Sequence, residues 1–110
     1  MIWLNRQEWQ KSFELVPRVA VDLVVKRANR VLLTKRKKPP FAGSWHLPGS
    51  FVLKGEKLEE CAQRVAGEEL GTKLVKIKLA GVFDNIEGDP RGHVIDVVYE
   101  CEVEDEPRAV

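Results

Sequence analysis

The sequence predicts an α+β fold, and three observations predict it. Segments rich in β-branched residues, which favour strands, lie on both sides of one long amphipathic helical segment. The 110 residues are 44% hydrophobic and 32% charged, as in ordinary soluble domains. A chain of this length buries roughly 60 to 70% of its unfolded surface, which suffices for one core. We therefore expect one domain over residues 1–110, with a lead-in at 1–16 and a tail at 104–110.

The first third of the chain predicts a lead-in and a hairpin. Three apolar residues recur at helical spacing: Trp9, Phe13 and Val16. Residues 1–16 are therefore expected to form a short helix or an irregular lead-in, which Pro17 ends. Residues 18–26 are β-branched and nearly alternating, which is typical of a strand. A polar connector at 27–30 is followed by a second such run at 31–36, so the two runs should pair as a hairpin.

The remaining elements follow in order. We expect a Pro- and Gly-containing loop at 37–44, a short strand around 45–47, a looped segment over 48–55, a helix at 56–70, a strand at 73–83, a polar loop at 84–92 and a strand at 93–103. Gly71 stands where a left-handed residue would end the helix. The strand, strand, strand, helix, strand, strand order is typical of the α+β class.

Composition and charge exclude several classes of protein. Eighteen basic and seventeen acidic residues give a net charge of +1, which supplies no field for stable nucleic-acid binding. Cys61 and Cys101 form neither a CxxC motif nor a disulfide framework, so we interpret both as small buried apolar residues. No apolar run approaches the roughly 18 residues of a membrane span, and the start lacks the order of a signal peptide. We expect a cytoplasmic protein with no membrane partner.

One charged residue of the predicted helix falls among its apolar residues. At helical spacing the apolar stripe consists of Leu58, Cys61, Ala62, Val65, Ala66 and Leu70. Glu60, Arg64 and Glu68 lie along one edge of this stripe, where they can pair, whereas Glu69 lies near its middle. Burying an unpaired carboxylate costs several kcal/mol, so Glu69 must protonate, pair with a cation or bind a metal. A loop that returns from Gly49 to the helix would bring a backbone carbonyl near Glu68 and Glu69. This favours metal binding by Glu69 without excluding a salt bridge.

Two segments then resemble the Nudix box of the MutT-like hydrolases. The box has the spacing G, five residues, E, seven residues, REUxEExGU, where U is apolar. Residues 49–56, with Ser50 at the position of the opening G, a spacer of seven residues, and residues 64–72 keep this spacing. Lys35-Arg36 and the run 43–49 are also similar to members of this family, and the likeness extends from about Arg18 to Val103. The resemblance implies an α/β/α sandwich with a mixed sheet. It also implies hydrolysis of a nucleoside diphosphate linked to another group, with Mg²⁺ or Mn²⁺ as cofactor.

The resemblance also assigns roles to residues. Arg64 corresponds to the box arginine, which orients a catalytic glutamate, and Glu68 and Glu69 correspond to metal-binding and catalytic carboxylates. Gly49 corresponds to the residue whose carbonyl binds the metal, and Glu56 to a glutamate that supports the helix start. The substrate would be a nucleotide-type small molecule.

Three positions depart from the family pattern. Ser50 replaces the opening glycine, Leu53 replaces a usually acidic residue, and Val65 replaces the glutamate that follows the arginine. Sugar-nucleotide hydrolases of the GDP-mannose type resemble this sequence in lacking that glutamate, and they attack sugar carbon rather than phosphorus. Three functions therefore stay open: pyrophosphate cleavage, sugar-nucleotide hydrolysis, and nucleotide binding without catalysis.

The remaining candidates come from the residues around the box. Within a basic run from Lys26 to Lys38, we expect Lys35 and Arg36 to contact phosphate and the rest to be solvated. Trp45 is the expected substrate-stacking residue, with Phe41, Phe83 and Tyr99 as further aromatic candidates. The general base is expected among Glu87, Asp89, His93 and Glu68.

Two features of the chain ends bear on assembly. Trp3 and Trp9 have no evident core partner, so a homodimer surface at the lead-in is one expectation. The tail shows no helical stripe, although family members usually continue into a second helix that covers the other sheet face. We expect that helix to be lacking, with residues 7–13, a second subunit or a missing segment in its place.

Overall fold

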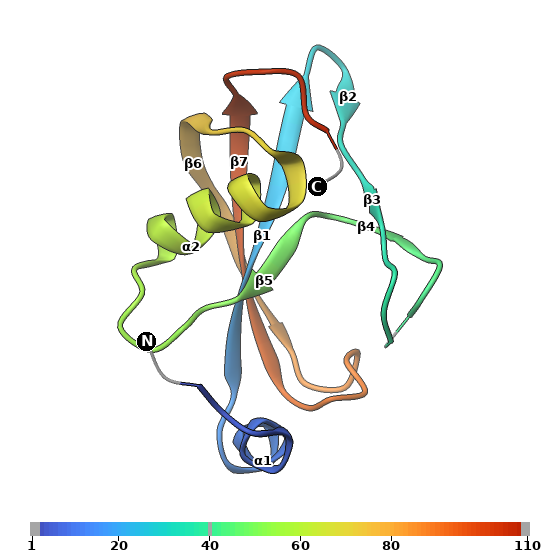
Figure 1. Cartoon of the computed structure of the whole chain (residues 1–110), viewed down its shortest axis with the longest axis vertical. Coiled ribbons are helices and arrows are strands. Elements are labelled where there is room, and N and C mark those ends of the chain that lie inside the picture. Colours follow the sequence, from blue (N-terminus) through green and yellow to red (C-terminus); the bar gives the residue numbers. More distant parts are fainter. Residues whose placement is uncertain (1–2, 40, 109–110) are drawn as a thin grey trace.

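The computed structural model describes residues 3–39 and 41–108 and confirms an α+β fold. Its elements are α1 (Arg6–Leu15), β1 (Arg18–Arg27), β2 (Arg30–Val31), β3 (Thr34–Lys35), β4 (Trp45–His46), β5 (Gly49–Phe51), α2 (Leu58–Val65), the π-helical turn η1 (Ala66–Leu70), β6 (Leu74–Asn85) and β7 (Val94–Val103) (Figure 1). The lead-in is a helix because Asn5 caps it: the Asn5 side chain accepts from Glu8 N at 2.8 Å, and Glu8 accepts from Asn5 N at 3.0 Å.

The main sheet is mixed, as the resemblance implies. Its strands run in the order β2-β1-β7-β6, and β5 also pairs with β1. Strand β7 lies parallel to β1, from Arg18 opposite Val94 to Val25 opposite Cys101, whereas β6 and β5 are antiparallel to their neighbours. Because β7 pairs in parallel with β1, these two strands lie side by side at the centre of the sheet (Figure 1).

The predicted hairpin at 31–36 is wrong beyond its first residues. Only Arg30 and Val31 form the β2 ladder with β1, while β3 pairs with β4 in a separate two-stranded sheet. The edge of β1 that a longer hairpin would use is occupied, because Leu23 N donates to Pro48 O at 2.8 Å and β5 pairs with the residues before it. The chain therefore leaves the main sheet, and β3 projects away from it (Figure 1).

The helix predicted at 56–70 forms from Leu58 and changes form after Val65. Residues 66–70 make a π turn, and Gly71 ends it with φ 65°, the left-handed conformation that glycine adopts without strain. Helix α2 packs on one face of the sheet, where Val65, Cys61 and Cys101 belong to the main core. Both cysteines are free and buried, as predicted.

The two ends of the chain pack differently from the expected sandwich. Helix α1 lies at the end of the sheet where β1 begins, so residues 7–13 do not cover a whole sheet face (Figure 1). Residues 104–108 are not helical; they return along η1, where Arg108 N donates to Leu70 O at 2.9 Å. Neither described helix is long and apolar enough to cross a membrane.

Candidate functional site

The site begins where η1 meets the start of β5. Glu69 Oε2 accepts a hydrogen bond from Gly49 N at 2.9 Å, so the structure brings these two predicted residues together. Burial raises the pKa of Glu69, and the Gly49 amide and the positive charges of His46 and Arg36 partly oppose that increase. Glu69 takes part in none of the ion pairs among residues 3–39 and 41–108. Glu69 is thus half-buried, and none of the ion pairs of the described residues neutralises it.

Gly49 is required by space. A Cβ at this position would lie 2.1 Å from Asp22 Oδ1 and 2.8 Å from Val21 O, closer than any side chain tolerates. The Asp22 carboxyl group therefore occupies the volume that a side chain at position 49 would fill. Gly49 and Asp22 are also direct partners in the β5–β1 ladder.

Sequence reasoning missed two aspartates near the site: Asp22, which lies close enough to Glu69 to feel its charge, and Asp96, which contacts Asp22. Burial, a hydrogen bond with Asp96 and the charges of Asp96 and Glu69 raise the pKa of Asp22 to about 7. Asp22 lies on β1 and Asp96 on β7, and both interrupt runs of β-branched residues. An acidic residue within such a run is the signal that could have identified them. The resulting carboxyl cluster consists of Asp22, Glu69 and Asp96.

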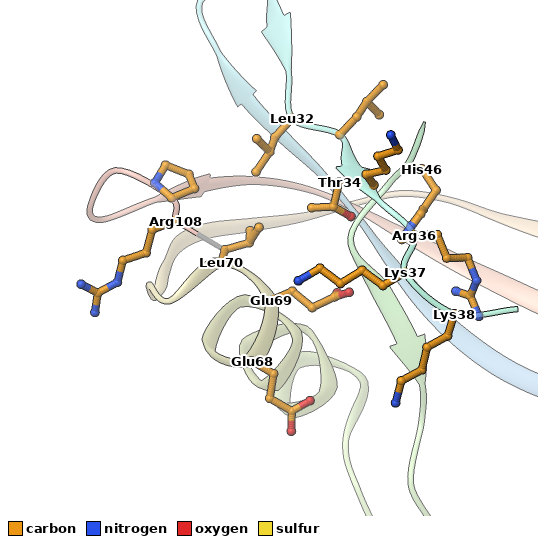
Figure 2. Close-up of a pocket in the computed structure, with 13 residues that line it drawn as sticks. Leu32, Thr34, Arg36, Lys37, Lys38, His46, Glu68, Glu69, Leu70 and Arg108 are labelled. Carbon is orange, nitrogen blue, oxygen red and sulfur yellow. The ribbon is translucent and has the colours of Figure 1, made fainter. Parts of the chain in front are cut away.

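Glu68 does not join Glu69. Its side chain is 63% exposed and lies 3.4 Å from Arg64 Nη1, and Figure 2 shows the two glutamates pointing in different directions. The expected arrangement of both carboxylates at Gly49 is therefore not present in this structure. The physical reason is the attraction of the neighbouring guanidinium group, which holds Glu68 on the outer side of the helix.

Arg64 links the helix to the loop that precedes it. Its Nε and Nη2 donate to the two carboxylate oxygens of Glu56 at 2.8 and 3.1 Å, and Nη2 also donates to Phe51 O at 2.9 Å. The Arg64 guanidinium lowers the pKa of Glu56, whose Oε1 in turn accepts from Leu53 N at 3.1 Å. Glu56 thus lies where a support for the helix start was expected. Val65, the next residue, is 0% exposed.

A cavity of about 560 Å³ opens beside the carboxyl cluster. Its cationic lining residues are Lys35, Arg36, Lys37, Lys38 and Arg108, and its acidic lining residues are Glu68 and Glu69 (Figure 2). Lys35 and Arg36 therefore lie where phosphate contacts were expected, while Lys37 and Lys38 were interpreted as solvated and line the cavity as well. Trp45 is not among the lining residues; it is 66% exposed, with Lys35 Nζ 5.9 Å from its ring centroid.

Besides Glu68, the three candidates for general base lie in or next to the β6–β7 loop. Asp89 accepts from Arg91 at 2.7 and 2.9 Å, and Arg91 lowers its pKa. His93 Nε2 lies 2.5 Å from Asp84 Oδ1, and Glu87 is exposed. Two of the three thus already have charged partners. Among the aromatic candidates, Tyr99 is 7% exposed within the main core, which leaves no ring face for a nucleobase.

The donor groups at Gly49 are all oxygens, the ligands that Mg²⁺ and Mn²⁺ prefer. Within the described part of the chain, no three His, Cys, Asp or Glu side chains are arranged to hold a metal ion. Carboxylates crowded beside a glycine backbone nevertheless have the chemistry that a hard divalent cation relieves, because the charges of Asp96 and Glu69 raise the pKa of Asp22 and the charge of Glu68 raises that of Glu69. The residues fit such an ion by donor type, with Glu69 in place and Glu68 turned away.

Comparisons with known proteins agree with this architecture. A family model described as the NUDIX domain matches residues 16–110. An ADP-ribose pyrophosphatase of Methanocaldococcus jannaschii is 47% identical over 90 residues, which are 81% of this chain and 53% of that protein. The low-salt glycan biosynthesis protein Agl8 of Haloferax volcanii is 34% identical over 105 residues, 90% of this chain and 67% of that protein.

A solved structure gives the same result for the fold. The MutT NUDIX hydrolase from Burkholderia pseudomallei superposes with a TM-score of 0.80 at 38% identity, covering 86% of this chain and 74% of that one. The chain spans about half the length of the Methanocaldococcus relative.

Proposed function

The chain belongs to the NUDIX domain family, and from this membership we propose that it hydrolyses a nucleoside diphosphate linked to a second group. One observation carries the proposal: the Glu69 carboxylate is held at the Gly49 backbone, 2.9 Å away, at the wall of a cavity whose lining also includes five cationic side chains. This juxtaposition supports the proposal, because the resemblance assigns metal binding to Glu69 and to the Gly49 backbone.

The cations would bind the diphosphate. Transfer at phosphorus spreads negative charge over the phosphate oxygens, so positioned positive groups supply most of the catalysis. Lys35 and Arg36 come from β3 and the residue after it, and Lys37 and Lys38 continue along the same segment of the wall. We assign phosphate binding to this segment. Trp45, on the neighbouring strand β4, would contact the part of the substrate that extends beyond the cavity.

We assign a divalent ion, Mg²⁺ or Mn²⁺, to the Gly49 carbonyl and the carboxylates of Glu69 and Glu68. The ion would neutralise phosphate charge and activate the attacking water. Glu68 would have to exchange Arg64 for the ion, a small change for a side chain that is 63% exposed. Arg64 would keep its two bonds to Glu56 and its bond to Phe51 O, and the latter would hold the helix against β5.

The test is a metal-supplemented activity screen with products identified by mass. ADP-ribose leads the panel because of the pyrophosphatase relative, followed by nucleotide sugars, dinucleoside polyphosphates and oxidised nucleotides. We expect activity that requires added Mg²⁺ or Mn²⁺ and disappears with chelator. Glu69→Gln should reduce turnover about 100-fold, whereas Glu104→Gln, at an exposed carboxylate outside the cavity lining, separates loss of the site from loss of charge. Activity that survives chelator and Glu69→Gln would refute the proposal.

A second candidate is hydrolysis of a sugar nucleotide at the sugar carbon. The observation that favours it is Val65, whose side chain is fully buried where the family pattern has a glutamate. A reaction at carbon is compatible with that loss in the sugar-nucleotide enzymes that the sequence resembles, and the Haloferax relative is named for glycan biosynthesis. Release of a nucleoside diphosphate and free sugar would establish this reaction, whereas a nucleoside monophosphate and sugar phosphate would exclude it.

The third candidate, binding without catalysis, follows from the same position. It predicts ligand binding with no turnover across the whole panel and the appearance of turnover in Val65→Glu. Since Val65 packs in the main core, thermal unfolding must first show that the variant folds.

A further inference from the structure

Helix α1 lies outside the residues that the family model matches, yet it packs against β5, the strand that Gly49 begins. The match begins at residue 16, and α1 ends at Leu15. Phe13, the buried residue of this helix, is 7% exposed and belongs to a small cluster separate from the main core, with Ala20, Val94 and Phe51 around it. An element outside the matched residues therefore buries an aromatic ring against β5.

Four side chains form what we call the arginine–phenylalanine cluster: Phe13, Arg18, Phe51 and Arg91. The two rings meet edge to face with centroids 5.2 Å apart. The Arg18 guanidinium carbon lies 4.7 and 4.8 Å from the Phe13 and Phe51 centroids, and that of Arg91 lies 6.0 and 4.9 Å from them. Each ring is thus in cation–π range of both arginines, an arrangement that favours one orientation of the rings.

Phe13 is also fixed from outside the cluster. Trp9 packs against the Phe13 ring with centroids 4.7 Å apart. This tryptophan, which is 36% exposed, therefore has an aromatic partner on the same helix. A Cβ at Gly92 would lie 3.0 Å from Phe13 O, which shows how closely the β6–β7 loop passes behind the helix. Ser12 Oγ accepts from Arg18 Nη1 at 2.8 Å and ties the helix to the start of β1.

Phe51 connects this cluster to the candidate metal site. It is the last residue of β5, the strand that Gly49 begins. Its carbonyl is held by Arg64 from the helix side at 2.9 Å, and its ring is held by Phe13 and the two arginines. Strand β5 has three residues and pairs only with β1 along the described chain, so side-chain contacts at Phe51 determine how firmly Gly49 is held beside Glu69.

We propose that Phe13 is a positioning residue, which acts through Phe51 to hold β5 and the Gly49 backbone in register with Glu69. The claim about the backbone stands on the contacts above, and its consequence for metal binding rests on the proposed function. Helix α1 then belongs to the working site, although it supplies no group that touches substrate.

The test compares Phe13→Ala and Phe13→Leu with Leu15→Ala, a truncation on the same helix at a residue that is 68% exposed. The exchange rates of the backbone amides are measured by NMR in the metal-free protein. The rates of residues 49–51 are compared with those of the core residues 97–101. We expect exchange in β5 about tenfold faster in Phe13→Ala, with the core amides unchanged within about twofold. Phe13→Leu should fall between, since it keeps apolar volume and loses the ring, and it carries the test if the alanine variant does not fold.

Mn²⁺ binding, measured by the loss of the free-ion EPR signal, gives the second readout. We expect binding to weaken about three- to tenfold in Phe13→Ala and to stay at the wild-type value in Leu15→Ala. Uniform acceleration of all amides, or unchanged exchange in β5, would overturn the positioning role and leave Phe13 as a packing residue only. Absence of Mn²⁺ binding by the wild-type protein would overturn the proposed metal site instead, and the exchange data would still decide the role of Phe13.

Discussion

Replacing Asp22 by asparagine should stabilise the metal-free protein at high pH and leave it nearly unchanged at low pH. The pKa of Asp22 is raised from 3.8 to about 7 in the folded protein. A raised carboxyl pKa means that its contribution to stability is fully present below the unfolded value and is lost as pH rises through the folded value. Above pH 7 the folded chain must hold a carboxylate among other carboxylates, whereas an asparagine amide stays neutral and can donate to Asp96.

The magnitude follows from the same values. At about 1.4 kcal/mol per pH unit, moving the pKa from 3.8 to about 7 amounts to about 4 kcal/mol over the full range. Between pH 5 and pH 8 the expected change is about 2 to 3 kcal/mol in favour of the variant. Urea unfolding at several pH values, in chelator, measures it as a shift in midpoint at constant slope. Asp105→Asn, at an exposed tail position, should follow the wild type throughout.

One outcome would refute the reasoning directly. If Asp22→Asn and wild type lose stability in parallel from pH 5 to pH 8, Asp22 is not the group that titrates there. The stability of Asp22→Asn relative to wild type could also fall from pH 5 to pH 8. That result would mean that the fold favours the ionised carboxylate and that the crowding with Glu69 and Asp96 is relieved in another way.

Three further outcomes are expected from other contacts. Glu56→Gln should lower the free energy of unfolding by about 2 to 3 kcal/mol, because Arg64 then keeps its charge without its carboxylate partner; an unchanged urea midpoint at pH 7 contradicts this. Gly49→Ala should cost about 1 to 3 kcal/mol and weaken Mn²⁺ binding, since its Cβ would collide with Asp22 Oδ1, and isothermal titration beside thermal unfolding separates the two effects. Thr34→Val should raise stability by about 1 kcal/mol, because Thr34 Oγ1 is buried without a hydrogen-bond partner among the described residues; Thr34→Ser, which keeps the hydroxyl, should not.

Local patterns predicted the elements, and long-range competition decided the exceptions. The β-branched run at 18–26 and the glycine at 71 report on their own segments, so strand β1 and the left-handed helix end were predictable. The partner of residues 34–35 was not, since it depends on Pro48 occupying the edge of β1. No pattern within 31–36 contains that information.

The site divides in the same way. Glu69 was identified because burying a carboxylate among apolar residues is costly unless it is neutralised. The same argument applied to Asp22 and Asp96, which lie within runs of β-branched residues, would have identified the rest of the cluster. Glu68 lies beside Arg64, the pairing that the helical spacing allowed, whereas its role as a metal ligand beside Gly49 stays a prediction of the motif. The chain also widens to a π turn after Val65, which α-helical spacing does not anticipate.

The parallel pairing of β1 with β7 has a consequence for biosynthesis. Residues 18–25 leave the ribosome before their central neighbours at 94–101, which follow only after residues 26–93 have been made. Until then the edge of β1 that will receive β7 is open, and the two aspartates cannot meet. Nascent chains of this protein should therefore stay protease-sensitive until β7 has emerged, and then acquire the sheet and the carboxyl cluster in one late step.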